Sequence, residues 1–229
     1  EALRWYQLAG DQGVANAQFN LAVMYDVGEG VSTNPGEAVR WYRLAAEQGL
    51  ANAQNNLAVM YEQGEGVQQN YGLAKHWYQL AAEQGVANSQ FSLGVYYHEG
   101  IGTPRNNQQA IYWFWAAADQ GVASAQFNLA LMYERGEGVP KDYREAGRWY
   151  RLAAEQGHPR AQNNLGLLYS IGRGVPSDRV QAYMWLNLSA AQGFEEAREA
   201  RDLVAKGLIP QEITEAENLT REWSRKAAH

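Results

Sequence analysis

The chain has 229 residues with 19 basic and 25 acidic side chains, and its net charge of −6 argues against a nucleic-acid partner, which would require a basic surface. It contains no cysteine, which excludes disulfide bonds, thiol nucleophiles and thiolate metal sites. The longest apolar run, Ala110 to Ala118, is about half as long as a membrane span, so no membrane span is predicted.

A pair of residues that begins with tryptophan recurs at a fixed spacing of 36 residues. The six pairs are Trp5-Tyr6, Trp41-Tyr42, Trp77-Tyr78, Trp113-Phe114, Trp149-Tyr150 and Trp185-Leu186. Self-similarity at a fixed period of this length is typical of repeat arrays. We therefore predict one array over 1–229, with units at 1–30, 31–66, 67–102, 103–138, 139–174 and 175–207 and a last segment at 208–229.

The second unit has the pattern of a helix hairpin. Its first helix is predicted to begin at Pro35, after the N-cap residue Asn34. Apolar residues then fall on one face of this helix and on one face of a second helix. They are Ala38, Trp41, Tyr42 and Ala45 in the first helix and Ala53, Leu57, Ala58 and Tyr61 in the second. Because a hairpin cannot bury this face alone, neighbouring hairpins must stack.

Glycines punctuate each unit at the expected helix ends. Gly49 follows the first helix of the second unit, and Gly64 and Gly66 follow its second helix. Glycine-rich turns can also bind phosphate, but these connectors lack the Lys-Ser/Thr of a phosphate-binding loop and recur at nearly every joint. The pattern therefore favours a structural role in the joint.

The repeated pattern reads A-x-x-W-Y-x-x-A-A-x-Q-G, then A-Q-x-x-L-G-x-x-Y, then G-x-G-V. It resembles the Sel-one-like repeat (SLR) family, relatives of tetratricopeptide repeats, over essentially the whole chain. The resemblance implies an all-α fold, a right-handed α/α superhelical solenoid, and a non-catalytic role in protein–protein interaction and scaffolding. It also implies a bacterial protein of the periplasm or envelope, where many members of the family act.

The two ends of the array differ in their predicted cover. Arg201 and Ala205 replace the leucine and tyrosine expected in the sixth unit. Segment 208–229 then has apolar residues at helical spacing, which predicts a capping helix; they are Ile213, Ala216, Leu219, Thr220 and Trp223. The first unit has no comparable cover for Trp5, Tyr6 and Tyr25, so we expect further residues before Glu1 or a contact with another chain there.

No catalytic, cofactor or metal site is predicted. The four histidines, at His76, His98, His158 and His229, form no i, i+4 pair, and no cysteine can join them as a ligand. The carboxylates that recur near the end of each first helix are typical of a solvated last turn. No strand pattern exists that could carry a nucleophile elbow.

The outward face of the first helices is the candidate binding surface. Its fourth and seventh positions lie opposite the buried stripe, and by resemblance to tetratricopeptide arrays they line a concave groove. The fourth position is Arg4, Arg40, His76, Tyr112, Arg148 and Met184 in successive units. The seventh is Gln7, Arg43, Gln79, Trp115, Arg151 and Asn187.

The fourth unit breaks the polar pattern of this face. Tyr112 and Trp115 replace polar residues, and Tyr96 stands just before them where other units have methionine or leucine. Exposed aromatic area commonly marks binding sites, and arginine binds carboxylates with two parallel hydrogen bonds. The predicted site therefore has an aromatic centre flanked by cationic residues and comprises Arg40, Arg43, His76, Tyr96, Tyr112, Trp115, Arg148 and Arg151.

Structural alternatives apply to the same residues. Tyr112 and Trp115 would pack on a shifted neighbour, and the arginines would pair with Glu47 or Glu155 of their own helices. An asparagine column in the second helices, Asn20, Asn56, Asn128 and Asn164, would either line the groove or make a structural hydrogen bond, and its regularity favours the latter.

The sequence thus predicts a non-catalytic scaffold that binds a protein or peptide segment in its groove. One alternative is β-lactam binding or hydrolysis, as in cysteine-rich relatives, but those carry a cysteine pair in each repeat and this chain has none. Another is recognition of a glycan or peptidoglycan fragment, whose sugar rings would stack on Tyr96, Tyr112 and Trp115.

Overall fold

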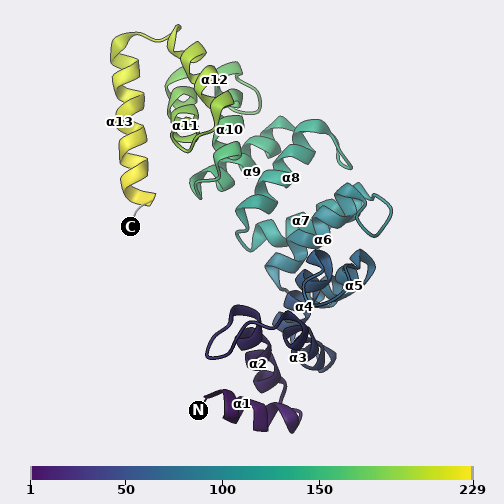
Figure 1. Cartoon of the computed structure of the whole chain (residues 1–229). Coiled ribbons are helices and arrows are strands. Elements are labelled where there is room, and N and C mark those ends of the chain that lie inside the picture. Colours follow the sequence, from purple (N-terminus) through teal and green to yellow (C-terminus); the bar gives the residue numbers. More distant parts are fainter. Residues whose placement is uncertain (1, 228–229) are drawn as a thin grey trace. The chain divides into compact units, whose positions relative to one another are not determined.

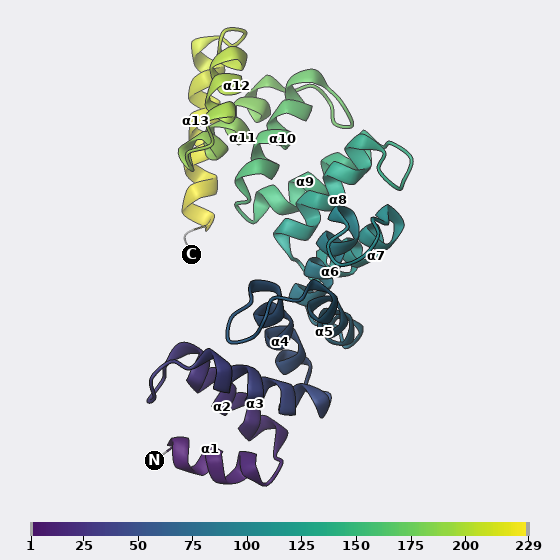
Figure 2. The same ribbon diagram turned by 45° about the vertical axis from the view of Figure 1, so that its right-hand side comes forward.

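The computed structural model describes residues 2–227, and over that range the chain forms thirteen α-helices arranged as six successive hairpins and a last helix (Figures 1 and 2). The hairpins pair α1 (Ala2–Asp11) with α2 (Ala15–Val27), α3 (Pro35–Glu47) with α4 (Ala51–Gln63), α5 (Tyr71–Glu83) with α6 (Ala87–Glu99), α7 (Asn107–Asp119) with α8 (Ala123–Arg135), α9 (Tyr143–Glu155) with α10 (Pro159–Ile171), and α11 (Arg179–Ala191) with α12 (Glu195–Ala205). The last helix is α13 (Pro210–Ala227). The predicted all-α hairpin repeats are confirmed.

The chain divides into two compact units, Glu1–Trp113 and Phe114–His229, with the division inside α7. Within each unit, the second helix of one hairpin packs against the first helix of the next, as α2 does on α3 and α10 on α11. Hairpins that stack in this way bury their apolar faces against each other, as the repeat pattern requires, whereas Trp5 on α1 is 70% exposed. Among residues 2–227, we find no helix with the length and apolarity needed to cross a membrane.

The core consists of columns that repeat from hairpin to hairpin. Ala38, Ala74, Ala110, Ala146 and Ala182 are fully buried, and so are Leu21, Leu57, Leu93, Leu129 and Leu165. An alanine at the first set of positions allows two helices to approach closely, and a leucine at the second fills the space between them. The repeated columns of the sequence thus form the buried face of these hairpins.

A series of hydrogen-bonded glutamines, which we call the glutamine ladder, joins neighbouring hairpins. The Nε2 groups of Gln18, Gln54, Gln90, Gln126 and Gln162 donate to the carbonyl oxygens of Gly10, Ala46, Ala82, Ala118 and Ala154 at 3.0 to 3.1 Å. The Nε2 groups of Gln48, Gln84, Gln156 and Gln192 donate to Oε1 of Gln18, Gln54, Gln126 and Gln162 at 2.7 to 2.9 Å. Each of these carbonyls at the end of a first helix also accepts a backbone N–H, as Ala46 does from Gly49 at 2.9 Å, so the ladder supplies its second hydrogen bond.

The connector glycines are required by space as well as by backbone conformation. Gly66 has a φ of +66°, and a Cβ at this position would lie 2.3 Å from the carbonyl carbon and oxygen of Pro35. Gly174 has a φ of +68° and approaches the Tyr143 carbonyl in the same way. The connector after the second helix therefore packs directly on the start of the first helix of its own hairpin, which supports the structural interpretation of these loops.

The last helix, α13, does not continue the stacking pattern. It packs against α11 rather than mainly on α12, the helix just before it, and Leu203 on α12 is 68% exposed. The side of α13 that faces away from solvent is the predicted stripe, in which Ala216 is fully buried and the Trp223 ring lies 6.2 Å from that of Trp185. The helix thus covers the first helix of the sixth hairpin.

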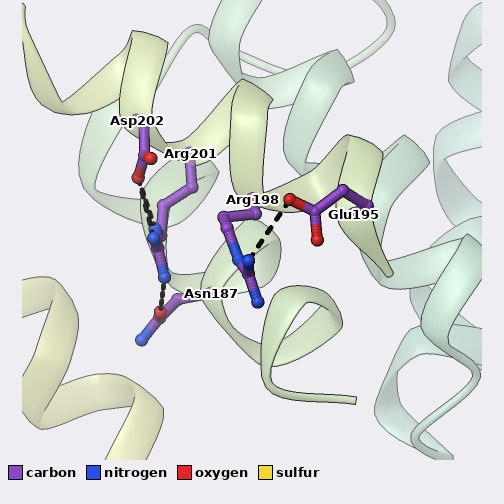
Figure 3. Close-up of polar contacts among 5 residues, drawn as sticks. All are labelled: Asn187, Glu195, Arg198, Arg201 and Asp202. Atoms are coloured by element: carbon purple, nitrogen blue, oxygen red, sulfur yellow. Dashed lines mark hydrogen bonds and ion pairs between the residues drawn. The ribbon is translucent and has the colours of Figure 1, made fainter. Parts of the chain in front are cut away.

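Arg201 occupies the leucine position of the sixth hairpin without being buried in its core. Its guanidinium donates to Asn187 Oδ1 at 3.0 Å and to Asp202 Oδ1 at 2.7 Å (Figure 3). One turn earlier on α12, Arg198 pairs with Glu195 at 3.3 Å (Figure 3). These polar contacts replace the apolar packing that leucine makes in the other hairpins.

Candidate partner-binding surface

Seven of the eight predicted site residues lie on the first helices of hairpins. Arg40 and Arg43 belong to α3, His76 to α5, Tyr112 and Trp115 to α7, and Arg148 and Arg151 to α9; all seven are exposed. Each helix turns them away from the buried tryptophan and alanine columns because they lie one or two residues from those columns, roughly 100° to 200° around the helix axis. We call the fourth and seventh positions of the first helices the outward face.

The two arginines of α3 are held by different partners. Arg40 pairs with Glu37 at 3.1 Å, and its guanidinium lies 4.3 Å from the centre of the Trp41 ring. Arg43 donates to the hydroxyl of Tyr61 at 2.7 Å. The side chain of Arg40 remains 52% exposed. The pair therefore presents two oriented guanidinium groups to solvent.

The same arrangement recurs three hairpins further along, on α9. Arg148 pairs with Glu145 at 3.4 Å and lies 5.1 Å from the Trp149 ring. Arg151 donates to the hydroxyl of Tyr169 at 2.6 Å. Two pairs of arginines separated by a whole number of repeats thus have the same local geometry.

These contacts correct the predicted partners of the arginines. The sequence suggested Glu47 and Glu155, whereas the arginines pair with Glu37 and Glu145 in the first turns of their helices. Arg43 and Arg151 stand closest in sequence to the predicted carboxylates, but the hydroxyl of a tyrosine on the neighbouring helix holds each of them.

Each arginine pair lines an open pocket. The first, which we call the Arg40 pocket, has a volume of about 480 Å³ and is lined by Gly36, Val39, Arg40, Arg43, Leu44, Gly66 and Val67. The second, the Arg148 pocket, has a volume of about 320 Å³ and is lined by Arg144, Gly147, Arg148, Arg151, Leu152, Gly174, Val175 and Pro176. Both combine a cationic wall with an apolar floor.

Sequence reasoning found the arginines of these pockets but missed the floor. Val67 and Val175 come from the connector loops, and they reach the arginines because Gly66 and Gly174 bring each loop against the start of the first helix. Gly147 adds space, since a Cβ there would lie 3.2 Å from Val175 Cγ1. The valine of the G-x-G-V motif was the sequence feature that could have predicted the apolar floor.

The third hairpin carries no arginine pair at the equivalent positions. His76 is exposed with its ring edge-on to Trp77 at 5.2 Å, and Gln79 donates to Glu83 on its own helix at 2.7 Å. The adjacent Lys75 donates to the hydroxyl of Thr103 at 2.8 Å. The outward face of this hairpin is therefore polar and less cationic.

Two of the aromatic residues of α7, Tyr112 and Trp115, are exposed. Tyr112, in the first compact unit, is 61% exposed and its ring meets Trp113 edge-on at 4.8 Å. Trp115, in the second compact unit, is 51% exposed. Each presents a large aromatic surface to solvent, a feature that commonly marks a binding surface.

Tyr96 lies in the core, which corrects its predicted place on the surface. It is 1% exposed, and its ring lies 5.7 Å from that of Tyr78 and 6.4 Å from that of Tyr71. Its column is buried in other hairpins too, as Met60 and Met132 show. The change to an aromatic residue at this position alters core packing, so Tyr96 is not part of the surface proposed below.

The asparagine column serves the core rather than the surface. Asn56 donates to the hydroxyl of Tyr42 at 3.1 Å, and Asn164 donates to that of Tyr150 at 2.9 Å. The Tyr42 hydroxyl in turn donates to Asp26 at 3.1 Å. Burial raises the pKa of Tyr42 and Tyr150 well above the usual range, so both remain neutral donors. These contacts support the structural interpretation of the column.

The histidines form no metal site in the described part of the chain. Within residues 2–227 no group of three or more histidine, aspartate or glutamate side chains is placed to hold a metal ion, and His229 lies outside these residues. His158 instead caps α10, because its Nδ1 accepts a hydrogen bond from the N–H of Ala161 at 3.2 Å.

The hairpins and their stacking define an α-helical repeat protein with an exposed outward face. The family model of the Sel1 repeat matches residues 1–14, 15–50, 51–86, 87–122, 123–158 and 159–194, so the chain belongs to the Sel1 repeat family. A comparison with curated proteins gives no significant match.

Solved structures of similar proteins come from several bacteria. A protective antigen of uropathogenic Escherichia coli with an SLR fold is 36% identical, with a TM-score of 0.87 over 99% of this chain and 49% of its own. A Sel1 repeat protein from Oxalobacter formigenes is 34% identical, with a TM-score of 0.75 over 86% of this chain and 57% of its own. The chain thus spans about half the length of these two relatives.

Proposed function

We propose that this chain is a non-catalytic scaffold that binds a segment of a partner protein on the outward face of its first helices. One observation carries the proposal: the outward face changes its chemistry from hairpin to hairpin while the buried columns stay the same. The outward pair is Arg40 and Arg43 in α3, His76 and Gln79 in α5, Tyr112 and Trp115 in α7, and Arg148 and Arg151 in α9. The stacking of hairpins requires only the buried columns, so the variation is available for specificity.

The residue types on this face suit protein recognition. Tyrosine and tryptophan supply large contact area at a low cost in conformational entropy, and tyrosine, tryptophan and arginine are the residues most enriched in binding hot spots. Membership of the Sel1 repeat family agrees with a binding role, since repeat arrays of this kind present extended surfaces. Each compact unit offers its own cationic side chains, on α3 in the first and on α9 in the second, and α7 carries the exposed aromatic ones.

Replacing Tyr112 and Trp115 by alanine tests this proposal. Because both side chains are exposed, the double variant should retain the melting temperature of the wild type within about 2 °C. The amount of partner protein that it captures from a native extract should be at least about tenfold lower than with the wild type. Mass spectrometry of the same captured protein in both samples measures the difference.

The matched control is the double variant Ile171→Ala and Leu203→Ala. Both residues are exposed apolar side chains, but they lie on the second helices α10 and α12. This control should capture partner as the wild type does. Equal capture by all three proteins would contradict the proposed surface while leaving the fold unaffected.

A further inference from the structure

The position of α13 shows what the outward face of a first helix can bind. In α11 the fourth position is Met184, the repeat equivalent of Arg40 and Arg148. It is only 6% exposed, whereas Arg40 and Arg148 retain 52% and 63% of their side-chain exposure. The difference coincides with α13, which packs against α11. In the sixth hairpin an amphipathic helix of this same chain thus packs on the first helix, whose fourth position is buried there and open in the second and fifth.

The side chains on that face match the helix that covers it. Tyr183, Met184 and Leu188 make the sixth hairpin apolar where the Arg40 pocket has Val39, Arg40 and Leu44. On α13 the facing stripe is also apolar, with Ala216 fully buried and Trp223 near Trp185. Acidic residues of α13, such as Glu215 and Glu222, remain exposed.

The second and fifth hairpins retain part of the apolar surface and add positive charge. Val39, Leu44 and Val67 form the floor of the Arg40 pocket, and Leu152 and Val175 have the same places in the Arg148 pocket. Because arginines lie beside each apolar floor, a partner that fits there must differ in charge from a helix that fits the sixth hairpin. A helix seated there must bring an apolar stripe for the floor and carboxylates for the guanidinium groups.

The arginines can accept such carboxylates. A guanidinium has five N–H donors, and the contacts with Glu37 and Tyr61 on one side and with Glu145 and Tyr169 on the other engage a minority of them. The pairs with Glu37 and Glu145 are exposed and join residues three apart on one helix, so each is weak. A partner carboxylate can therefore replace them.

We propose that the Arg40 pocket and the Arg148 pocket each bind one acidic amphipathic helix of a protein partner, seated as α13 is on α11. This inference rests on the proposed scaffold function and specifies the partner's chemistry and the number of sites. Each compact unit carries one pocket. The Arg148 pocket should bind more tightly, because it has a third arginine, Arg144, where the other pocket has Gly36.

Calorimetric titration of the full chain with a synthetic helix tests the proposal. The probe is an 18-residue helix-forming peptide with leucine and alanine along one face and glutamate on both flanks, and the control probe has lysine in place of every glutamate. The wild type should bind two acidic peptides and none of the lysine peptide at the same concentration. The variants R40Q/R43Q and R148Q/R151Q should each lose one site, with affinity at that site at least about tenfold weaker.

A charge-matched variant separates the pockets from general electrostatic attraction. R135Q/R160Q removes two exposed arginines that line neither pocket, and it should still bind two peptides. The proposal is overturned if the acidic peptide does not bind, if both pocket variants retain two sites, or if R135Q/R160Q loses binding equally. In each of these cases a loss of partner capture by the Tyr112 and Trp115 double variant would still support the proposed function.

Discussion

His158 holds the start of α10 in place through its neutral ring. The Nδ1 atom accepts a hydrogen bond from the Ala161 N–H, and the ring stacks on Phe127 with centroids 4.7 Å apart. Burial, and secondarily the positive charge of Arg160, lower the pKa of His158 below its usual value. Protonation would add a hydrogen to Nδ1 and remove the acceptor, so this cap operates in the neutral state.

We predict that acidification destabilises the protein through His158. The unfolded chain takes up the proton near pH 6.5, and the folded chain only at a lower pH, so the unfolded state binds more protons as the pH falls through 6.5. Stability present above that value is then lost. Between pH 7.5 and 5.5 the melting temperature of the wild type should fall by a few degrees more than that of His158→Asn, whose side chain caps without titrating. Parallel curves for the two proteins would contradict this role.

At the scale of helices, the glutamine ladder connects each hairpin to the next. Gln54 on α4 is 3% exposed, donates to the Ala46 carbonyl at 3.1 Å and accepts from Gln84 at 2.7 Å. Ala46 lies in α3 and Gln84 caps the end of α5, so one side chain connects three helices. Its removal would take one hydrogen bond from the Ala46 carbonyl and one from the Gln84 amide.

The predicted cost of Gln54→Ala is about 1 to 3 kcal/mol of unfolding free energy, because two partly or fully buried hydrogen bonds are lost and a small cavity forms. Gln63→Ala is the control, since Gln63 is an exposed glutamine at the end of the same helix. It should change stability by less than about 0.5 kcal/mol. Denaturant unfolding of the two variants measures the difference, and similar values would show that the ladder contributes little.

The sequence predicts the hairpins well because their apolar columns repeat five or six times and each repetition reinforces the same helix register. Tyr96 shows where that reasoning fails: an unusual residue type indicated a surface feature, but the register of its column, shared with Met60, places it in the core. The floors of the two arginine pockets were missed for a different reason. They depend on how closely the connector at Gly66 approaches Pro35, and this distance is a tertiary property.

At the scale of the whole molecule, the sequence predicted a last helix but not its docking place. The stripe from Ile213 to Trp223 specifies an amphipathic helix, and such a stripe fits any apolar surface of suitable width. The choice of α11 follows from Tyr183 and Met184, which make the outward face apolar in the sixth hairpin. The sequence shows the stripe of α13 and the apolar residues of α11 separately, and only the structure shows that the two helices pack together.

Deletion of residues 208–229 should expose this apolar face. We expect the truncated chain to bind a hydrophobic dye more strongly and to melt on the order of 10 °C lower, since the contact between Trp185 and Trp223 is lost with the helix. Adding a peptide of residues 210–227 should restore most of the melting temperature. The control peptide carries Ala216→Glu and Trp223→Glu, and restoration by both peptides would show that the effect is not specific docking.

The glutamine ladder also affects how the number of repeats in such a chain can change by duplication. Each ladder glutamine finds its donor 30 residues further on and its acceptor carbonyl 8 residues back, so the pattern of bonds has no fixed starting point. Duplication of any window of one period, wherever it begins, leaves every old bond intact and creates a complete new set. An insertion of any other length between a glutamine and its donor breaks the register. Gene duplication can therefore lengthen the array with the same hydrogen bonds between hairpins. The exposed outward face of each added copy can then diverge in sequence.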